Sequence, residues 1–143
     1  MSLTLEEALL TAIAAEEEAS QFYRRLGSNT TETRAKALLD AMASDEESHA
    51  QHLRAMADRI VEGTLADIVV TTPTSLESRP DWEDVEDITY EQVLELGLEG
   101  ERNAALFYSA LADQTTGELQ ELLELLTAKE LEHARNIKAI SRK

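Results

Sequence analysis

The sequence contains no cysteine, only two prolines and five glycines, and 13 basic residues against 29 acidic ones. The absence of cysteine excludes disulfide bonds, thiolate metal sites and cysteine nucleophiles. Low proline and glycine content, with abundant leucine, alanine and glutamate, favours an all-α protein. The net charge of −16 disfavours binding to nucleic acids and anionic membranes, and it favours cations or basic partners.

The sequence also lacks any apolar run long enough to span a membrane. Its N-terminal stretch carries glutamates where a signal peptide would be apolar. We therefore expect a soluble, cytoplasmic protein that binds neither nucleic acid nor membrane. At 143 residues the chain is most simply one domain, residues 1–143, and it is long enough to bury a substantial core.

Apolar residues recur in alternating steps of three and four, which predicts amphipathic helices. These apolar seams cover residues 5–26, 35–60, 90–111 and 119–140. Thr4 with Glu7 and Thr89 with Gln92 have the spacing of capping boxes, which predicts the start of the first and third helices. Gly27 and the polar residues after it predict the end of the first helix.

The second half of the chain repeats the first. A shift of 85 residues superimposes the first helix on the third, and a shift of 84 superimposes the second on the fourth. We interpret the chain as a duplicated helical hairpin, residues 4–61 and 89–141, joined by a crossover over residues 62–88. Short loops make each hairpin antiparallel, and the crossover is long enough to run the length of a bundle. The prediction is a four-helix bundle with one long crossover.

Six ionisable side chains lie on the apolar seams near the middle of their helices: Glu16, Glu46, His49, Glu101, Glu130 and His133. Burying one unpaired carboxylate costs several kcal/mol, and burying four would exceed the net stability of a domain. Two divalent cations would neutralise four carboxylates, and two neutral imidazoles would complete the ligand set. In each Glu-x-x-His pair the two side chains share a helix face and can reach one metal. The alternative, that these groups are solvated, conflicts with their place on the seams.

Four motifs resemble those of the ferritin-like superfamily, most closely the short rubrerythrin-related diiron proteins. They are "EEEASQFY" and "EGERNAALFY", each with a glutamate seven residues before a tyrosine, and "EESH" and "ELEH". The resemblance covers nearly the whole chain outside residues 62–88. It implies a ferritin-like bundle whose six seam residues bind two iron ions, with manganese as the alternative metal. It also implies that Glu46 and Glu130 are best placed to bridge the ions.

The same resemblance implies oxidoreductase activity toward peroxide or O2, of the peroxidase or ferroxidase type, in the response to oxidative stress. Iron oxidation with storage or sequestration is one alternative function, and manganese catalase-like peroxide disproportionation is another. A peroxidase without cysteine would need an external electron-donor protein, because no rubredoxin iron can be held here. We further expect a homo-oligomer, a dimer or larger.

Two features depart from the rubrerythrin pattern. Ala104 occupies the position where rubrerythrins carry an additional carboxylate, one turn after the glutamate of the third helix. The cysteine-rich rubredoxin domain is missing from the sequence. The symmetric set of four glutamates and two histidines is similar to the diiron centre of bacterioferritin, although no methionine is clearly placed as a haem ligand.

Tyr23 and Tyr108 are the candidate catalytic residues. They lie two turns beyond Glu16 and Glu101 on the same helix faces. A tyrosine there could hydrogen-bond a ligand carboxylate or donate an electron. Alternatively, both are core aromatic residues whose hydroxyls have a structural partner and no function.

Asp45 lies one turn before His49 and could hold its imidazole in one tautomer. The internal repeat places Lys129 at the equivalent position, so a symmetric role is excluded. His52 is matched by Asn136 in the repeat, and a surface position is a better interpretation for it than metal ligation.

Overall fold

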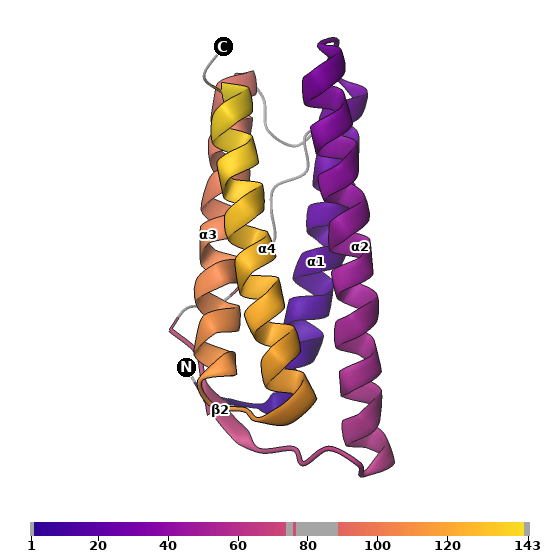
Figure 1. The fold of residues 1–143 in the computed structure, drawn as a ribbon, viewed down its shortest axis with the longest axis vertical. Coiled ribbons are helices and arrows are strands. Elements are labelled where there is room, and N and C mark those ends of the chain that lie inside the picture. The colour runs from indigo at the N-terminus through magenta and orange to yellow at the C-terminus, as the bar shows by residue number, and fades with distance from the viewer. Residues whose placement is uncertain (1, 74–75, 77–88, 142–143) are drawn as a thin grey trace.

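The computed structural model describes residues 2–73, 76 and 89–141, and it confirms an all-α bundle. Its helices are α1 (Leu5–Ser28), α2 (Thr33–Glu62), α3 (Tyr90–Ala112) and α4 (Gly117–Ser141). Two short strands are also present, β1 (Ser2–Thr4) and β2 (Val69–Thr71). In Figure 1, α1 and α4 run upward and α2 and α3 run downward, so each hairpin is antiparallel.

The first and third helices begin at the predicted capping boxes. The Thr4 hydroxyl accepts from the Glu7 amide at 3.1 Å, and the Glu7 carboxylate accepts from the Thr4 amide at 2.9 Å. Thr89 and Gln92 make the same reciprocal pair at the start of α3. These contacts satisfy amide groups that have no partner inside the helix.

Helix α1 ends at Ser28, the first of the polar residues after Gly27, as the sequence predicted. A Cβ atom on Gly27 would lie 2.7 Å from Asp40 Oδ1 on α2. The glycine also marks a close approach between α1 and α2.

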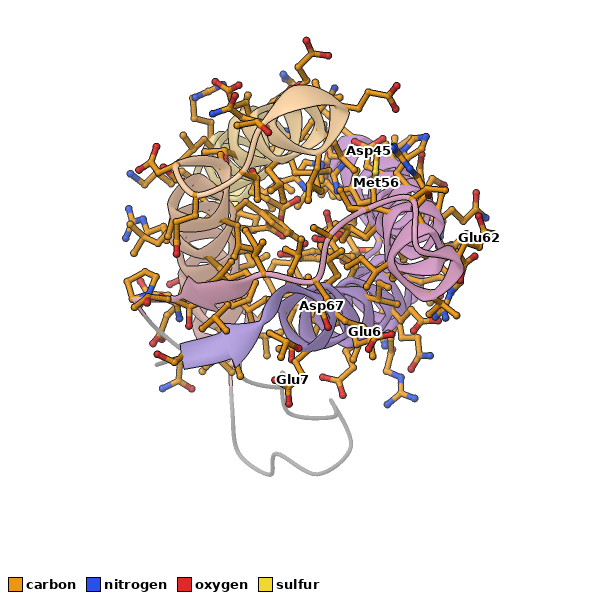
Figure 2. The ribbon with its side chains drawn as sticks, turned by 90° about the horizontal axis from the view of Figure 1, so that it is seen from below. Glu6, Glu7, Asp45, Met56, Glu62 and Asp67 are labelled. Atoms are coloured by element: carbon orange, nitrogen blue, oxygen red, sulfur yellow. The ribbon has the colours of Figure 1, made fainter. Side chains whose placement is uncertain are left out.

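The first residues of the crossover are hydrogen-bonded to the N-terminal residues of the chain. The sequence did not predict this contact. Strands β1 and β2 pair antiparallel, with Leu3 opposite Val70. Figure 2, a view along the bundle from below, shows Asp67 beside the first turn of α1, where its carboxylate accepts from the Glu6 amide at 2.9 Å. The rest of the predicted crossover, residues 74–75 and 77–88, lies outside the described residues.

The interior consists of two apolar clusters, one toward each end of the bundle, filled by side chains from all four helices (Figure 2). The lower cluster, beside the strands, contains Leu9, Leu53, Leu111 and Leu123 among others. The upper cluster contains Leu26, Leu39, Leu94 and Ile137 among others. No helix in the described part of the chain has the length and apolar character that crossing a membrane requires.

Candidate metal centre

The six predicted ligands form a polar layer between the two apolar clusters. Helices α1 and α3 each contribute one glutamate, and α2 and α4 each contribute a Glu-x-x-His pair: Glu16, Glu101, Glu46 with His49, and Glu130 with His133. None of the six is more than 6% exposed. The structure thus brings all six together, and their coordination of a metal stays a prediction.

The six residues divide into two overlapping groups. One group is Glu16, Glu46, His49 and Glu130, and the other is Glu46, Glu101, Glu130 and His133. Within each group, one ligand atom from every residue lies within 4.8 Å of the others. Glu46 and Glu130 belong to both groups, so their carboxylates occupy the position that bridging ligands need.

Each imidazole turns its Nδ1 atom toward the carboxylates. His49 Nδ1 lies 3.3 Å from Glu16 Oε2 and 3.3 Å from Glu130 Oε1. His133 Nδ1 lies 3.2 Å from Glu46 Oε1. The two rings are nearly parallel, at 19°, with centroids 6.1 Å apart. Two histidines thus approach the shared carboxylates from two helices.

Several buried atoms of the cluster make no hydrogen bond within the described part of the chain. They are Glu46 Oε1, both carboxylate oxygens of Glu130, and His133 Nδ1. Buried polar atoms normally have a partner, and losing one costs on the order of 1–3 kcal/mol. Carboxylate oxygens and imidazole nitrogens together suit iron, manganese or zinc. The donor set therefore fits a pair of divalent cations.

Crowding changes the acidity of the glutamates. Burial, reinforced by the charge of Glu46, raises the pKa of Glu16 to about 7. Burial and the neighbouring carboxylates Glu101 and Glu46 raise the pKa of Glu130 well above its usual value. Burial would also raise the pKa of Glu46, but the imidazoles of His133 and His49, within 3.2 and 3.4 Å of its Oε1, lower it to about 2.

The pKa values of the two histidines are raised, whereas the pKa of a buried imidazole is ordinarily lowered. Burial alone would lower the pKa of each ring. Close contacts with the carboxylates of Glu16 and Glu46 outweigh burial and raise the pKa of His49 to about 9. The same kind of contact raises the pKa of His133 to about 11. In the metal-free protein, the two protonated imidazoles therefore supply positive charge to the cluster of glutamates.

The two candidate catalytic tyrosines are fully buried. Each hydrogen-bonds a glutamate of the opposite hairpin that belongs to only one of the two groups; we call these two side chains, Glu16 and Glu101, the terminal carboxylates. The Tyr23 hydroxyl donates to Glu101 Oε1 at 2.6 Å, and the Tyr108 hydroxyl donates to Glu16 Oε1 at 2.6 Å. Burial raises the pKa of Tyr108, so its phenol stays protonated and remains a donor. Both hydroxyls thus hold predicted ligands, and a catalytic role for them stays a prediction.

Asp45 does not orient His49, the partner that its place one turn away had suggested. Its carboxylate instead accepts a hydrogen bond from His133 Nε2 at 3.0 Å. Figure 2 shows Asp45 on the side of α2 that faces α4. Sequence spacing missed this pair because it depends on how the two hairpins pack.

Two other positions add no ligand. His52 is exposed, as its place in the repeat indicated. Ala104 is buried within the lower apolar cluster, so the additional carboxylate of rubrerythrins has no counterpart at this position.

Comparison with known proteins agrees with this geometry. Residues 7–91, more than half of the chain, match the family model Rubrerythrin, and the matched segment includes Glu16, Glu46 and His49. The fold is similar to a crystal structure from Thermotoga maritima that is described as a ferritin-like diiron-carboxylate protein. The TM-score is 0.84 at 25% sequence identity, over 99% of this chain and 96% of that chain. No curated protein matches the sequence significantly.

Proposed function

The chain belongs to the rubrerythrin family, and from this premise we propose that it is a diiron oxidoreductase that reduces hydrogen peroxide to water. The observation that carries the proposal is the buried cluster of four glutamates and two histidines, divided into two groups that share Glu46 and Glu130. The diiron-carboxylate description of the Thermotoga protein supports iron as the metal.

Each residue has a proposed place in the site. Glu16 and His49 would hold one iron ion, Glu101 and His133 would hold the other, and the two shared carboxylates would contact both. When bound, the two ions supply the capacity to accept and release two electrons, one at each ion, which a peroxide reduction needs. The protein's own contribution is to gather oxygen and nitrogen donors in a layer enclosed by apolar side chains.

The reaction consumes one hydrogen peroxide, two protons and two electrons and yields two waters. The electrons come from a donor outside these 143 residues, because they contain no cysteine to hold an iron–sulfur or rubredoxin centre. Tyr23 and Tyr108 keep the terminal carboxylates in position through hydrogen bonds of 2.6 Å. We assign these phenols the further role of passing an electron toward the site.

Iron oxidation followed by storage is the second candidate function. The observation that favours it is Ala104, buried among apolar side chains where rubrerythrins carry an additional carboxylate. The remaining set of four glutamates and two histidines is then symmetric, as in bacterioferritin. A manganese form that disproportionates peroxide is the metal-swapped variant.

A stopped-flow comparison separates these functions. The anaerobic Fe(II) protein is mixed with hydrogen peroxide or with O2, and an iron-loading assay follows. The peroxidase proposal predicts faster oxidation by peroxide and a limit of about two irons per chain, the capacity of a dinuclear site. Faster oxidation by O2 with accumulation of tens of irons would establish storage instead. O2 release from peroxide by the manganese form alone would establish the catalase variant.

A further inference from the structure

The two histidines of the cluster differ in the contacts of Nε2, the ring nitrogen that faces away from the glutamates. His133 uses both ring nitrogens: Nδ1 faces the carboxylates, and Nε2 lies 3.0 Å from Asp45 Oδ2. An ionised carboxylate can only accept, so Nε2 carries the proton and donates to Asp45. When metal binding displaces the proton of Nδ1, the lone pair of that nitrogen is directed toward the cluster, because Asp45 keeps the other proton on Nε2. Asp45 thus selects the tautomer of His133 that can bind a metal.

Among the described residues, no carboxylate accepts a hydrogen bond from Nε2 of His49. Its Nδ1 faces Glu16 and Glu130, but its Nε2 makes no hydrogen bond or ion pair within the described part of the chain. The internal repeat places Lys129 where an equivalent of Asp45 would stand. A lysine ammonium cannot accept from an imidazole N–H, and Lys129 Nζ instead lies 3.6 Å from Glu132 Oε2 on its own helix.

We propose that Asp45 makes the two metal positions unequal, so that the ion held by His133 and Glu101 binds first and more tightly than the ion held by His49 and Glu16. This inference rests on the proposed function. A carboxylate that accepts from the outer N–H fixes the ring orientation and increases the basicity of the metal-binding nitrogen. The opposite charges of Asp45 and Lys129 act in the same direction, because negative charge near a cation site favours occupancy. Asp45 is a positioning residue and touches no metal itself.

Variants with one metal position each allow a direct test with Co(II) alone, whose visible absorption reports binding. His49→Ala leaves the group Glu46, Glu101, Glu130 and His133, and His133→Ala leaves the other group. Asp45→Ala is then added to each variant. In the His49→Ala protein it should weaken Co(II) binding about 10–100-fold. In the His133→Ala protein the dissociation constant should change by no more than about twofold, as expected for an independent site.

Two further substitutions separate positioning from a merely structural role. Asp45→Asn keeps an oxygen that accepts from His133 Nε2, so it should restore part of the affinity lost in Asp45→Ala. Lys129→Asp introduces the missing acceptor and should tighten Co(II) binding in the His133→Ala protein. Far-UV circular dichroism of each variant verifies that the bundle is folded. If Asp45→Ala weakens both single-position proteins equally, or neither of them, the proposal is wrong.

The same titrations distinguish failure of this inference from failure of the proposed site. Wild-type protein should bind two Co(II) per chain, in two steps of different affinity. If the wild-type protein binds two Co(II) ions but Asp45→Ala does not selectively weaken the position of His133, only the proposed difference in affinity between the two positions is wrong. A wild-type protein that binds no Co(II) would overturn both the inequality and the metal centre.

Discussion

Tyr23 on α1 donates a 2.6 Å hydrogen bond to Glu101 on α3, which joins the two helical hairpins through a predicted metal ligand. The internal repeat produces the reciprocal bond from Tyr108 to Glu16. Each hairpin therefore positions a terminal carboxylate of the other. This arrangement couples the packing of the hairpins to the geometry of the site.

Replacing either buried tyrosine by phenylalanine should weaken both the fold and metal binding. Tyr23→Phe and Tyr108→Phe each remove a hydrogen bond to a buried carboxylate. The free energy of unfolding of the metal-free protein should fall by about 1.5–3 kcal/mol, the usual contribution of a hydrogen bond to a charged group. Urea denaturation measures this loss, and Co(II) titration should show lower affinity.

Tyr90→Phe is the matched control for these two variants. The Tyr90 hydroxyl lies 3.3 Å from Thr30 Oγ1, among half-buried residues outside the cluster. Its removal should leave Co(II) affinity unchanged. Equal loss of affinity in all three variants would show that the hydrogen bonds to Glu101 and Glu16 have no special part in the site.

The metal-free protein should become less stable as the pH rises from about 5 to about 9. Glu16 has a pKa of about 7 in the folded state against 4.5 ordinarily, so its stabilising proton is lost as pH rises through 7. His49 has a pKa of about 9 against 6.5, so its stabilisation is complete below 6.5 and is lost toward 9. The lowered pKa of Glu46 has the opposite effect, but only below its ordinary value of 4.5.

Metal loading should reverse this pH trend, because a metal needs ionised glutamates and neutral histidines. Thermal melts of the metal-free and Mn(II)-loaded proteins should therefore diverge as pH increases. Parallel melting curves across this range would contradict the assignment of Glu16 and His49 to one metal-binding cluster.

Glu130→Gln should stabilise the metal-free protein while it removes metal binding. Both Glu130 oxygens are buried and make no hydrogen bond in the described part of the chain, and burial raises the pKa of this carboxyl. A neutral amide of the same shape removes the cost of ionisation, so the free energy of unfolding at pH 8 should increase by about 1 kcal/mol.

Glu124→Gln on the same helix provides the control, because Glu124 is exposed. It should change the free energy of unfolding by less than about 0.5 kcal/mol, as surface substitutions usually do. Metal binding should also be unaffected. A Glu130→Gln protein that is less stable than wild type at pH 8 would show that the carboxylate stabilises the bundle without metal.

The sequence predicted the helices and the gathering of six ionisable residues because both follow from periodicity. A glutamate such as Glu101, in the middle of an apolar seam, must face the bundle interior whatever the exact packing. The internal repeat contains each of these seam glutamates and Glu-x-x-His pairs twice, so their position on the apolar seams is not a coincidence of a glutamate-rich sequence.

Contacts between the hairpins were not predictable in the same way. The partner of Asp45 depends on the distance and rotation between α2 and α4, and neither is encoded in spacing along one helix. Strands β1 and β2 have three residues each, too few for a period-two pattern.

The most direct test of the metal centre is the iron content of the protein after anaerobic loading with Fe(II) and removal of free metal. We predict about two irons per chain by elemental analysis, the capacity of a dinuclear site. The double variant Glu46→Ala with Glu130→Ala loses both carboxylates that the two groups share, and it should retain none. Two irons per chain in that variant, or none in the wild type, would contradict the account.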